Sequence, residues 1–459
     1  MQNNINYKFF TGCIFLLAAV ILLFSSCRKF VENGTPPSSL TEDKAFSDSA
    51  TATSVVLAMY TRVANTNPQN NSIAFNITKF GAMSADVAYY LTNTSFDNFK
   101  NNTLTAGNEL NGLWSDLYAN IGRSNYAIRN LEASATLSSS VKNQLLAESK
   151  FWRAWSYFYL VNFFGDVPLV INTDALTNGL LPRTPVAQVY QQIVADLNSA
   201  KDLLTNNYPS IERARVNKRV AAALLARVYF YQQNWAMAEA EASEVISSGT
   251  YSLVTDLNSV FVKTSNEVIL QVASSTGVTS WGGEFIPAST TPNVVLYDTL
   301  ANAFEPNDLR KANWTKPLVY GGKTYLYPYK YKVRSGTAGN EYHVTLRLAE
   351  MYLIRSEARV NQNNVTGALS DLNLVRQRAG ISQLPSTTTK EAVLAALERE
   401  RWLELFTEWA DRWFNLKRLG KADAVLGKIK PQWQANQKLY PLPNQAMQAN
   451  PNLVNNPGY

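Results

Sequence analysis

Histidine and cysteine are almost absent from this sequence of 459 residues, which contains one histidine and two cysteines. A Ser-His-Asp triad could use only His343, and a zinc site made of several histidines is excluded. His343 lies in "NEYHVTLRLAEMY", just ahead of an apolar-periodic helix, and we predict a structural or surface role for it. We therefore expect no cofactor, no metal site and no histidine-based catalysis.

Charged residues are also scarce. They make up 17% of the chain, below the roughly 25% of ordinary domains, while aromatic residues reach 12%. The net charge is +7, but no run of five or six lysines or arginines forms a stripe for nucleic acid. The composition indicates a weakly charged surface rich in aromatic rings, and it argues against nucleic-acid binding.

The N-terminal segment predicts export. After "MQNNINYK" comes the apolar run "FFTGCIFLLAAVILLF" and then "SSC", so we assign residues 1–26 to a signal peptide. A transmembrane anchor is the alternative, because the run is close to the length that spans a bilayer. The position of Cys27 in "FSSC" resembles a bacterial lipobox and favours lipidation of Cys27. Cys13 would leave with the signal peptide, so the mature chain would contain no disulfide and no free thiol.

Helical periodicity dominates the chain beyond a polar tether, which we place at residues 27–45. Apolar residues recur at helical spacing through much of residues 46–249. In "RTPVAQVYQQIVADLNSAKDLL", Thr184 is the expected N-cap and Pro185 the first helical residue.

Two segments predict pairs of helices joined by a short turn, at residues 224–246 and 354–376. Ala238 and Ala368 occupy equivalent positions in them, a small-residue pattern that resembles tetratricopeptide helix pairs. The pairs are too far apart in sequence for a regular repeat array, so other structure must be inserted between them.

The insertion, residues 250–340, has the turn residues and short apolar runs of loops and strands. Its segment "YGGKTYLYPYKYK" alternates tyrosines as a strand does. The rings could cover a helix face, or the cluster could form part of a ligand surface. Loops held on a rigid helical frame are frequent binding surfaces.

The sequence as a whole resembles the SusD/RagB family of outer-membrane nutrient-binding lipoproteins, across nearly all of the mature chain. Ala410 differs from the glycine usual at its position in that family. The segments that carry the resemblance are "CRKFVENGTPPSSLTEDKAFSDSATATSVVLAMY", "AESKFWRAWSYFYLVNFFGDVPLV", "LRLAEMYLIRSEA" with "ALSDLNLVRQRAGI", "ERERWLELFTEWADRWFNLKRLG" and "YPLPNQAMQANPNLVNNPGY".

The resemblance implies a mainly α fold, a tetratricopeptide-like superhelix of helix pairs, with an irregular loop and short-strand subdomain that binds the ligand. It also implies that residues 341–459 form a C-terminal helical region with an Asn/Pro-rich tail. Family members bind glycans, or less often peptides, at the cell surface and cover a SusC-like TonB-dependent transporter. No catalysis is implied, and the outward-facing location of the lipid anchor follows from the resemblance alone.

The stretch "RWLELFTEWADRWFNLKRLG", residues 401–420, combines acidic residues with tryptophans, as a glycosidase cleft does. A continuous helix would place Glu400, Glu404 and Glu408 on one face, with Arg412 within reach of Glu408. A glycosidase needs two carboxyls on opposite sides of a sugar, about 5 to 9 Å apart. We therefore predict a structural, ion-paired segment, with an ion-paired and partly buried Arg412. Its packing residues would be Trp402, Trp409 and Trp413.

For the ligand face, we predict that residues 84–99 meet the insertion. Both regions lie outside the strongest helical patterns and combine rings with amides or carboxylates. Sugar rings stack on aromatic side chains, and their hydroxyls need polar partners. The predicted stacking residues are Tyr89, Tyr90, Trp281 and Trp314, the predicted hydroxyl partners are Asp86 and Asn93, and Tyr297 and Asn293 complete the set.

Three classes of function remain open on the sequence. A glycan-binding lipoprotein accounts for the anchor, the missing catalytic histidines and the aromatic insertion. A surface glycoside hydrolase using only Asp and Glu would need no histidine, and a tetratricopeptide scaffold would need no pocket. A peptide-binding member of the same family is a further alternative.

Overall fold

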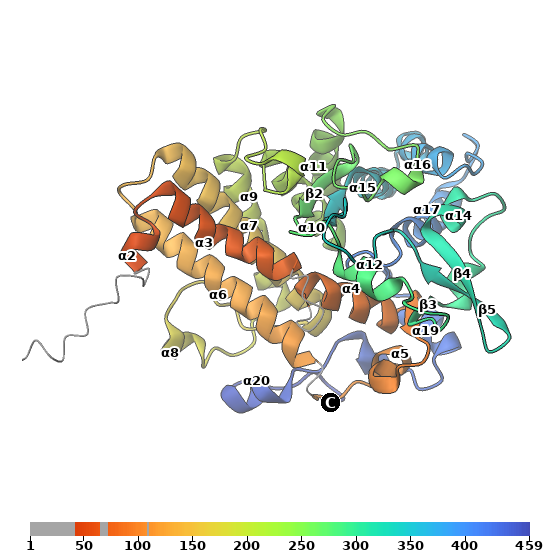
Figure 1. The fold of residues 1–459 in the computed structure, drawn as a ribbon, viewed down its shortest axis with the longest axis horizontal. Helices are drawn as coiled ribbons and strands as arrows, with labels where there is room; N and C mark the ends of the chain where they lie inside the picture. Colours follow the sequence, from red (N-terminus) through yellow and green to blue (C-terminus); the bar gives the residue numbers. More distant parts are fainter. Residues whose placement is uncertain (1–41, 65–71, 108–109) are drawn as a thin grey trace, which may run out of the picture.

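The structure is a computed structural model that describes residues 42–64, 72–107 and 110–459. The predicted signal peptide, Cys27 and most of the tether lie outside these residues. Helices form most of the molecule, and the short strands lie partly at one side of it and partly near its middle (Figure 1). Among the helices in the described ranges, none has both the length and the hydrophobicity to cross a membrane.

The frame is a row of helices in which each packs on the next (Figure 1). Helix α7 is buried along most of its length because it has large apolar side chains on nearly every face. One predicted start is off by one residue, since α9 begins at Val186 and Thr184 instead pairs with Val167 in a β-bridge. The first helices of the row are α3 (Ser49–Ala64), α6 (Asn111–Ala133), α7 (Ser139–Phe164) and α9 (Val186–Leu203).

The two predicted helix pairs are confirmed. They are α10 (Lys218–Tyr231) with α11 (Trp235–Ser247), and α15 (Leu348–Asn361) with α16 (Val365–Arg378). Ala238 and Ala368 are fully buried where the helices of each pair approach one another. Although the insertion separates the pairs in sequence, α11 packs against α15, and α17 (Lys390–Leu405) continues the row against α15 and α16.

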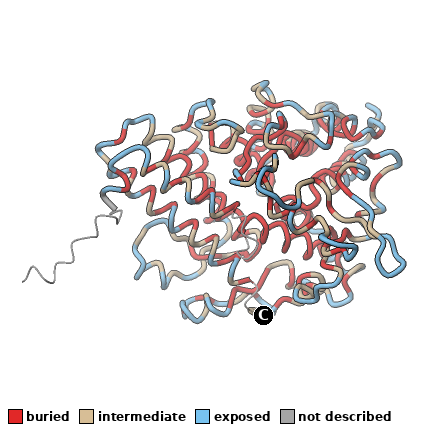
Figure 2. Tube along the Cα trace, viewed as in Figure 1, coloured by how far each residue is buried: buried red, intermediate tan, exposed pale blue. Residues whose placement is uncertain are grey.

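The insertion forms three two-stranded antiparallel sheets with neighbouring segments. Strand β2 (Val268–Val272) pairs with β6 (His343–Arg347), and β3 (Val294–Leu296) pairs with β1 (Ala88–Tyr90). Strands β4 (Thr315–Tyr320) and β5 (Lys323–Pro328) form a hairpin that projects from the side of the molecule and is exposed at its tip (Figures 1 and 2). Its turn uses Gly321 and Gly322, both at positive φ, which is the conformation a two-residue hairpin turn requires.

Shorter elements connect these parts. They are α2 (Glu42–Ala45), α4 (Ile73–Ser84), η2 (Thr94–Phe96), α5 (Asp97–Asn101), α8 (Ala175–Asn178), η4 (Ile211–Arg213), η5 (Leu257–Ser259), α12 (Ser280–Phe285), α13 (Asp298–Ala301), α14 (Leu309–Trp314), α18 (Asp411–Arg418), α19 (Ala422–Ile429), η6 (Ala435–Lys438) and α20 (Asn444–Ala449).

Residues 401–420 do not form the continuous helix that we predicted. Helix α17 ends at Leu405, and Thr407, Trp409 and Ala410 then adopt positive φ before α18 begins. Glu408 is therefore not on the same helix as Glu404. The positive φ of +62° at Ala410 also explains why glycine is suited to this position.

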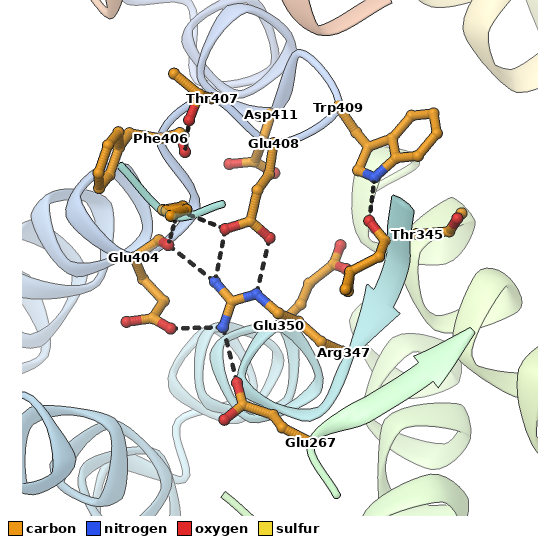
Figure 3. Close-up of polar contacts among 12 residues, drawn as sticks. Glu267, Thr345, Arg347, Glu350, Glu404, Phe406, Thr407, Glu408, Trp409 and Asp411 are labelled. Carbon is orange, nitrogen blue, oxygen red and sulfur yellow. Dashed lines mark hydrogen bonds and ion pairs between the residues drawn. The ribbon is translucent and has the colours of Figure 1, made fainter. Parts of the chain in front are cut away.

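The structural role predicted for this stretch is nevertheless confirmed, because its carboxylates bind buried cations (Figure 3). Arg347 contacts Glu404 at 2.6 Å, Glu408 at 2.7 Å and Glu267 at 2.8 Å. Lys330, from the insertion, also binds Glu408. Burial alone would raise the pKa of Glu404, but nearby arginines, Arg347 among them, hold that pKa well below its ordinary value. These pairs tie the insertion to the C-terminal helices.

Candidate ligand-binding face

The predicted meeting of residues 84–99 with the insertion is confirmed by the sheet of β1 and β3. Tyr89 lies opposite Val295, and Tyr90 lies opposite Val294. The half-buried rings of Tyr89 and Tyr297 pack with their centroids 4.8 Å apart. Two aromatic side chains from distant parts of the sequence thus share one surface.

The β4–β5 hairpin extends this surface, since β5 packs beside β3. Side chains alternate between the faces of a strand, so Tyr325 and Tyr327 lie on one face of β5. Tyr89 lies on β1, which pairs with β3, and Lys323 of β5 binds Asp298, the residue after Tyr297. Burial raises the pKa of Tyr89, Lys323 lowers it, and Tyr325 and Asp298 raise it further. Beyond the strand, the ring of Tyr329 follows 6.1 Å from that of Tyr327. We call this set the tyrosine face, and its members are Tyr89, Tyr297, Tyr325, Tyr327 and Tyr329.

Lysine side chains lie over these rings. The ammonium nitrogen of Lys100 is 4.4 Å from the ring centroid of Tyr89, and that of Lys323 is 4.8 Å from that of Tyr325. Tyr329 has two such neighbours, Lys332 at 4.3 Å and Lys316 at 5.6 Å. The tyrosine face therefore combines apolar rings with positive charge.

Carboxylates also lie near this positive charge. Glu341 and Asp256 are acidic neighbours of Lys332. Asp97 is an acidic neighbour of Tyr297.

Asp298 binds Lys323 at 2.8 Å, and both side chains are exposed. Glu284 lies deeper, where it accepts hydrogen bonds from the hydroxyl of Tyr90 and from the amide of Asn293. Tyr90 is buried and its hydroxyl donates to Glu284, which corrects our assignment of Tyr90 as a stacking residue. Asn293 binds the same carboxylate.

The structure corrects our assignment of the two tryptophans. Trp314 is fully buried, and its indole nitrogen donates to the Leu257 carbonyl at 2.9 Å. Trp281 is 1% exposed and packs between Tyr331 and Trp409. Neither ring has a free side on which a sugar could stack. A tryptophan is suited both to a core and to a sugar platform, so the sequence contained no signal that separates the two uses.

Asp86 is also placed differently from our expectation. Its buried carboxylate accepts two hydrogen bonds from Arg412, at 2.8 and 2.9 Å. Arg412 is ion-paired, as predicted, and it is buried; its partners are Asp86 at 2.8 Å and Glu398 at 3.6 Å, not Glu408. Asn93 is exposed at the edge of the face, where its side-chain oxygen accepts from the backbone N–H of Ser95 at 3.0 Å.

His343 has a structural position. It is fully buried in β6, and its Nε2 accepts a hydrogen bond from the backbone N–H of Ser280 at 3.1 Å. Burial lowers the pKa of the imidazole to about 3, so the ring is neutral at physiological pH. Within the described ranges, no group of three or more His, Cys, Asp or Glu side chains is arranged to hold a metal ion.

A separate groove of about 560 Å³ lies between the loop after α5 and the C-terminal segment. Its lining is uncharged and consists of Thr103, Leu104, Thr105, Ala106, Gln432, Gln434, Asn436, Gln437, Gly458 and Tyr459. No motif or periodicity in these segments indicated a groove. By contrast, the tyrosines of β5 stood out through their alternation in "YGGKTYLYPYKYK".

Two family models together match residues 33–437 of this chain. Residues 33–230 match a SusD-like family described as "Starch-binding associating with outer membrane", and residues 227–437 match the SusD family. A SusD-like protein of Formosa agariphila is 27% identical over 430 residues, which cover 78% of this chain and 83% of that protein. A second one from the same organism is 26% identical over 260 residues, and the match spans only about half of its length, 48%.

Solved structures show the same fold. A SusD superfamily protein from Bacteroides vulgatus has a TM-score of 0.79 at 20% identity and covers 90% of this chain and 99% of its own. A protein described as a laminarin-binding SusD-like protein has a TM-score of 0.76 at 24% identity, with 90% of this chain and 99% of its own chain covered. These identities establish similarity of architecture.

Proposed function

This chain belongs to the SusD/RagB family, and on that basis we propose that it is a non-catalytic outer-membrane lipoprotein that binds glycan nutrients on its tyrosine face. The observation that carries the proposal is the convergence of Tyr89 and Tyr297 with the tyrosines of the β4–β5 hairpin. A similar structure described as laminarin-binding is consistent with it.

The chemistry of the face suits a sugar chain. Pyranose rings present apolar C–H faces that pack on aromatic side chains, and their hydroxyls need charged or amide partners. Same-face residues of a strand are about 6.6 Å apart, so Tyr325 and Tyr327 form a linear platform rather than a closed pocket. An open, extended platform favours an oligosaccharide over a single sugar.

Binding without cleavage is supported by the state of the carboxylates beside tryptophan in residues 401–420. Glu404 and Glu408 are buried and bind Arg347, and Glu400 binds Arg310. Because these three carboxylates are buried and ion-paired, they do not contact a sugar bound on the tyrosine face. A glycosidase would need two carboxyls facing one another across the substrate.

We further propose that a lipid on Cys27 anchors the protein to the outer membrane and that a SusC-like TonB-dependent transporter receives the glycan. Several acyl chains anchor a protein stably, at about 0.8 kcal/mol per buried CH₂. Both parts rest on the "FSSC" sequence and on the family.

Incubation of the purified protein with a panel of oligosaccharides tests the proposal. We expect retention of at least one glycan without new reducing ends. New reducing ends would identify a hydrolase, retention of peptides alone a peptide-binding protein, and no retention at all a scaffold.

Variants locate the site. Tyr89→Ala and Tyr325→Ala should each weaken binding about five- to a hundredfold, because losing an aromatic platform costs roughly 1 to 3 kcal/mol in comparable ring stacking. Trp314→Phe is the matched control, since Trp314 is buried and should change stability but not affinity per folded molecule. Folded Tyr89→Ala and Tyr325→Ala proteins that bind like the parent would show that the ligand lies elsewhere.

A further inference from the structure

Three of the five rings of the tyrosine face already have a cation close over one side. An ammonium group lies within 5 Å of the centroid of Tyr89, Tyr325 and Tyr329, contributed by Lys100, Lys323 and Lys332 in turn. A cation at this distance is attracted to the electron-rich face of the ring. A ligand that stacks on the same side of such a ring must displace the lysine or interact with it.

Displacing the lysine and interacting with it give different free energies of binding. A neutral sugar that displaces the ammonium group gains a C–H contact but loses the attraction between cation and ring. A sugar with a negative charge can instead pair with the same ammonium group through a charge-assisted hydrogen bond. The lysines therefore discriminate between neutral and anionic ligands.

The charge on the face is only partly compensated. Lys323 binds Asp298 at the surface, and Lys332 has Glu341 and Asp256 as acidic neighbours. Glu284 accepts hydrogen bonds from Tyr90 and Asn293. Within the described ranges, Lys100 and Lys316 bind rings and form no ion pair with a carboxylate. Exposed pairs such as Lys323–Asp298 contribute little, so an anionic ligand can replace Asp298 at low cost.

We infer that the tyrosine face selects acidic oligosaccharides, whose carboxylate or sulfate groups bind Lys100 and Lys323 while their rings lie along Tyr89, Tyr325 and Tyr327. Asp298 holds Lys323 over its ring until the ligand replaces it. This inference rests on the proposed function, since it specifies the class of glycan.

Calorimetric titration of the purified protein at low and high salt tests the inference. The anionic probes are oligogalacturonate and oligoalginate for carboxylates and carrageenan oligosaccharides for sulfates. The neutral probes are laminari- and malto-oligosaccharides and the methyl ester of the same oligogalacturonate, which removes only the charge. We expect at least one anionic probe to bind more tightly than every neutral probe, and its affinity to fall about fivefold or more between 20 mM and 500 mM NaCl, as screening predicts.

Charge variants give effects of opposite sign. Lys100→Gln and Lys323→Gln should each weaken binding of the anionic probe about two- to fivefold, whereas Asp298→Asn should strengthen it by a similar factor. A neutral probe should bind Lys100→Gln at least as well as the parent, because the ring of Tyr89 is then uncovered. Lys44→Gln is the control, since Lys44 is exposed in α2, at the opposite end of the molecule from the hairpin (Figure 1).

The outcomes separate the two proposals. Preferential binding of a neutral probe, unaffected by salt and by the lysine variants, would overturn the acidic-glycan inference and leave glycan binding intact. Absence of binding to every probe would overturn both. Preference for sulfated over carboxylated probes, or the reverse, would identify which anionic group the lysines bind.

Discussion

The ion pair between Arg412 and Asp86 provides the sharpest test of how the ligand face is held. The guanidinium donates two hydrogen bonds to the Asp86 carboxylate, and the two residues are 326 positions apart in sequence. The same guanidinium lies 4.4 Å from the ring centroid of Trp402. Asp86 lies just before β1 and Arg412 lies in α18, so the ion pair connects the segment that leads into β1 with α18.

Arg412→Ala should destabilise the protein by about 3 to 5 kcal/mol, since it leaves the Asp86 carboxylate buried without its partner. Asp86→Ala should also destabilise the protein, but by less, because the buried guanidinium keeps Glu398 at 3.6 Å as a second partner. The double variant should lose less free energy of unfolding than the two single variants together, because it leaves neither an Asp86 carboxylate nor an Arg412 guanidinium buried without the other. The coupling free energy expected for residues in direct contact is about 0.5 to 3 kcal/mol.

Chemical denaturation followed by circular dichroism measures these differences, with thermal unfolding as a second readout. Lys438→Ala is the matched control, because Lys438 and Asp423 form an ion pair that is 40% and 50% exposed, and its loss should cost no more than about 1 kcal/mol. Glycan affinity per folded molecule should be unchanged in Arg412→Ala. Lost affinity with unchanged stability would refute the structural role and place Arg412 in the binding site.

Three further predictions concern other parts of the chain. Ala410→Gly should raise the free energy of unfolding by about 1 kcal/mol, because Ala410 has a φ of +62°; a destabilised variant would show that the side chain's packing outweighs the strain. The free energy of unfolding should fall as the pH drops from 6.5 towards 3. Burial lowers the pKa of His343 to about 3, so in this pH range only the unfolded chain binds a proton at His343. The contribution of His343 to this fall is at most about 1.4 kcal/mol per pH unit. His343→Gln should therefore flatten this part of the pH profile, and an unchanged slope would contradict the buried neutral imidazole. Cys27→Ser should abolish acyl labelling and leave an unprocessed or mislocalised precursor, whereas unchanged labelling would rule out lipidation of Cys27.

The helical frame could be predicted because its signals are local. Periodicity at helical spacing and small residues such as Ala238 and Ala368 act within a few turns of chain, and the two helix pairs formed as expected. The alternating tyrosines of β5 were likewise a local signal, and the structure places them beside Tyr89. What remained open was whether these rings cover a helix or face outward.

The break after Leu405 shows the limit of periodicity. Residues 401–420 have the spacing of a single helix, yet positive φ at Thr407, Trp409 and Ala410 interrupts it. The interruption places Glu408 beside Arg347 and Lys330, which come from other elements. Glu408 needs cationic partners once it is buried, and those partners lie too far away in the chain for a local window of sequence to contain them.

The sequence by itself determined the helix pairs, the strand-forming insertion and the residue types available for a ligand. Only the tertiary structure decided which aromatic residues reach the surface, because Trp281 and Trp314 have the same chemistry as platform tryptophans and differ only in what packs around them. It likewise decided that Asp86 pairs with Arg412 and that lysines lie over the exposed tyrosines. Burial and pairing are sums over contacts between distant segments, and those contacts exist only once the chain has folded.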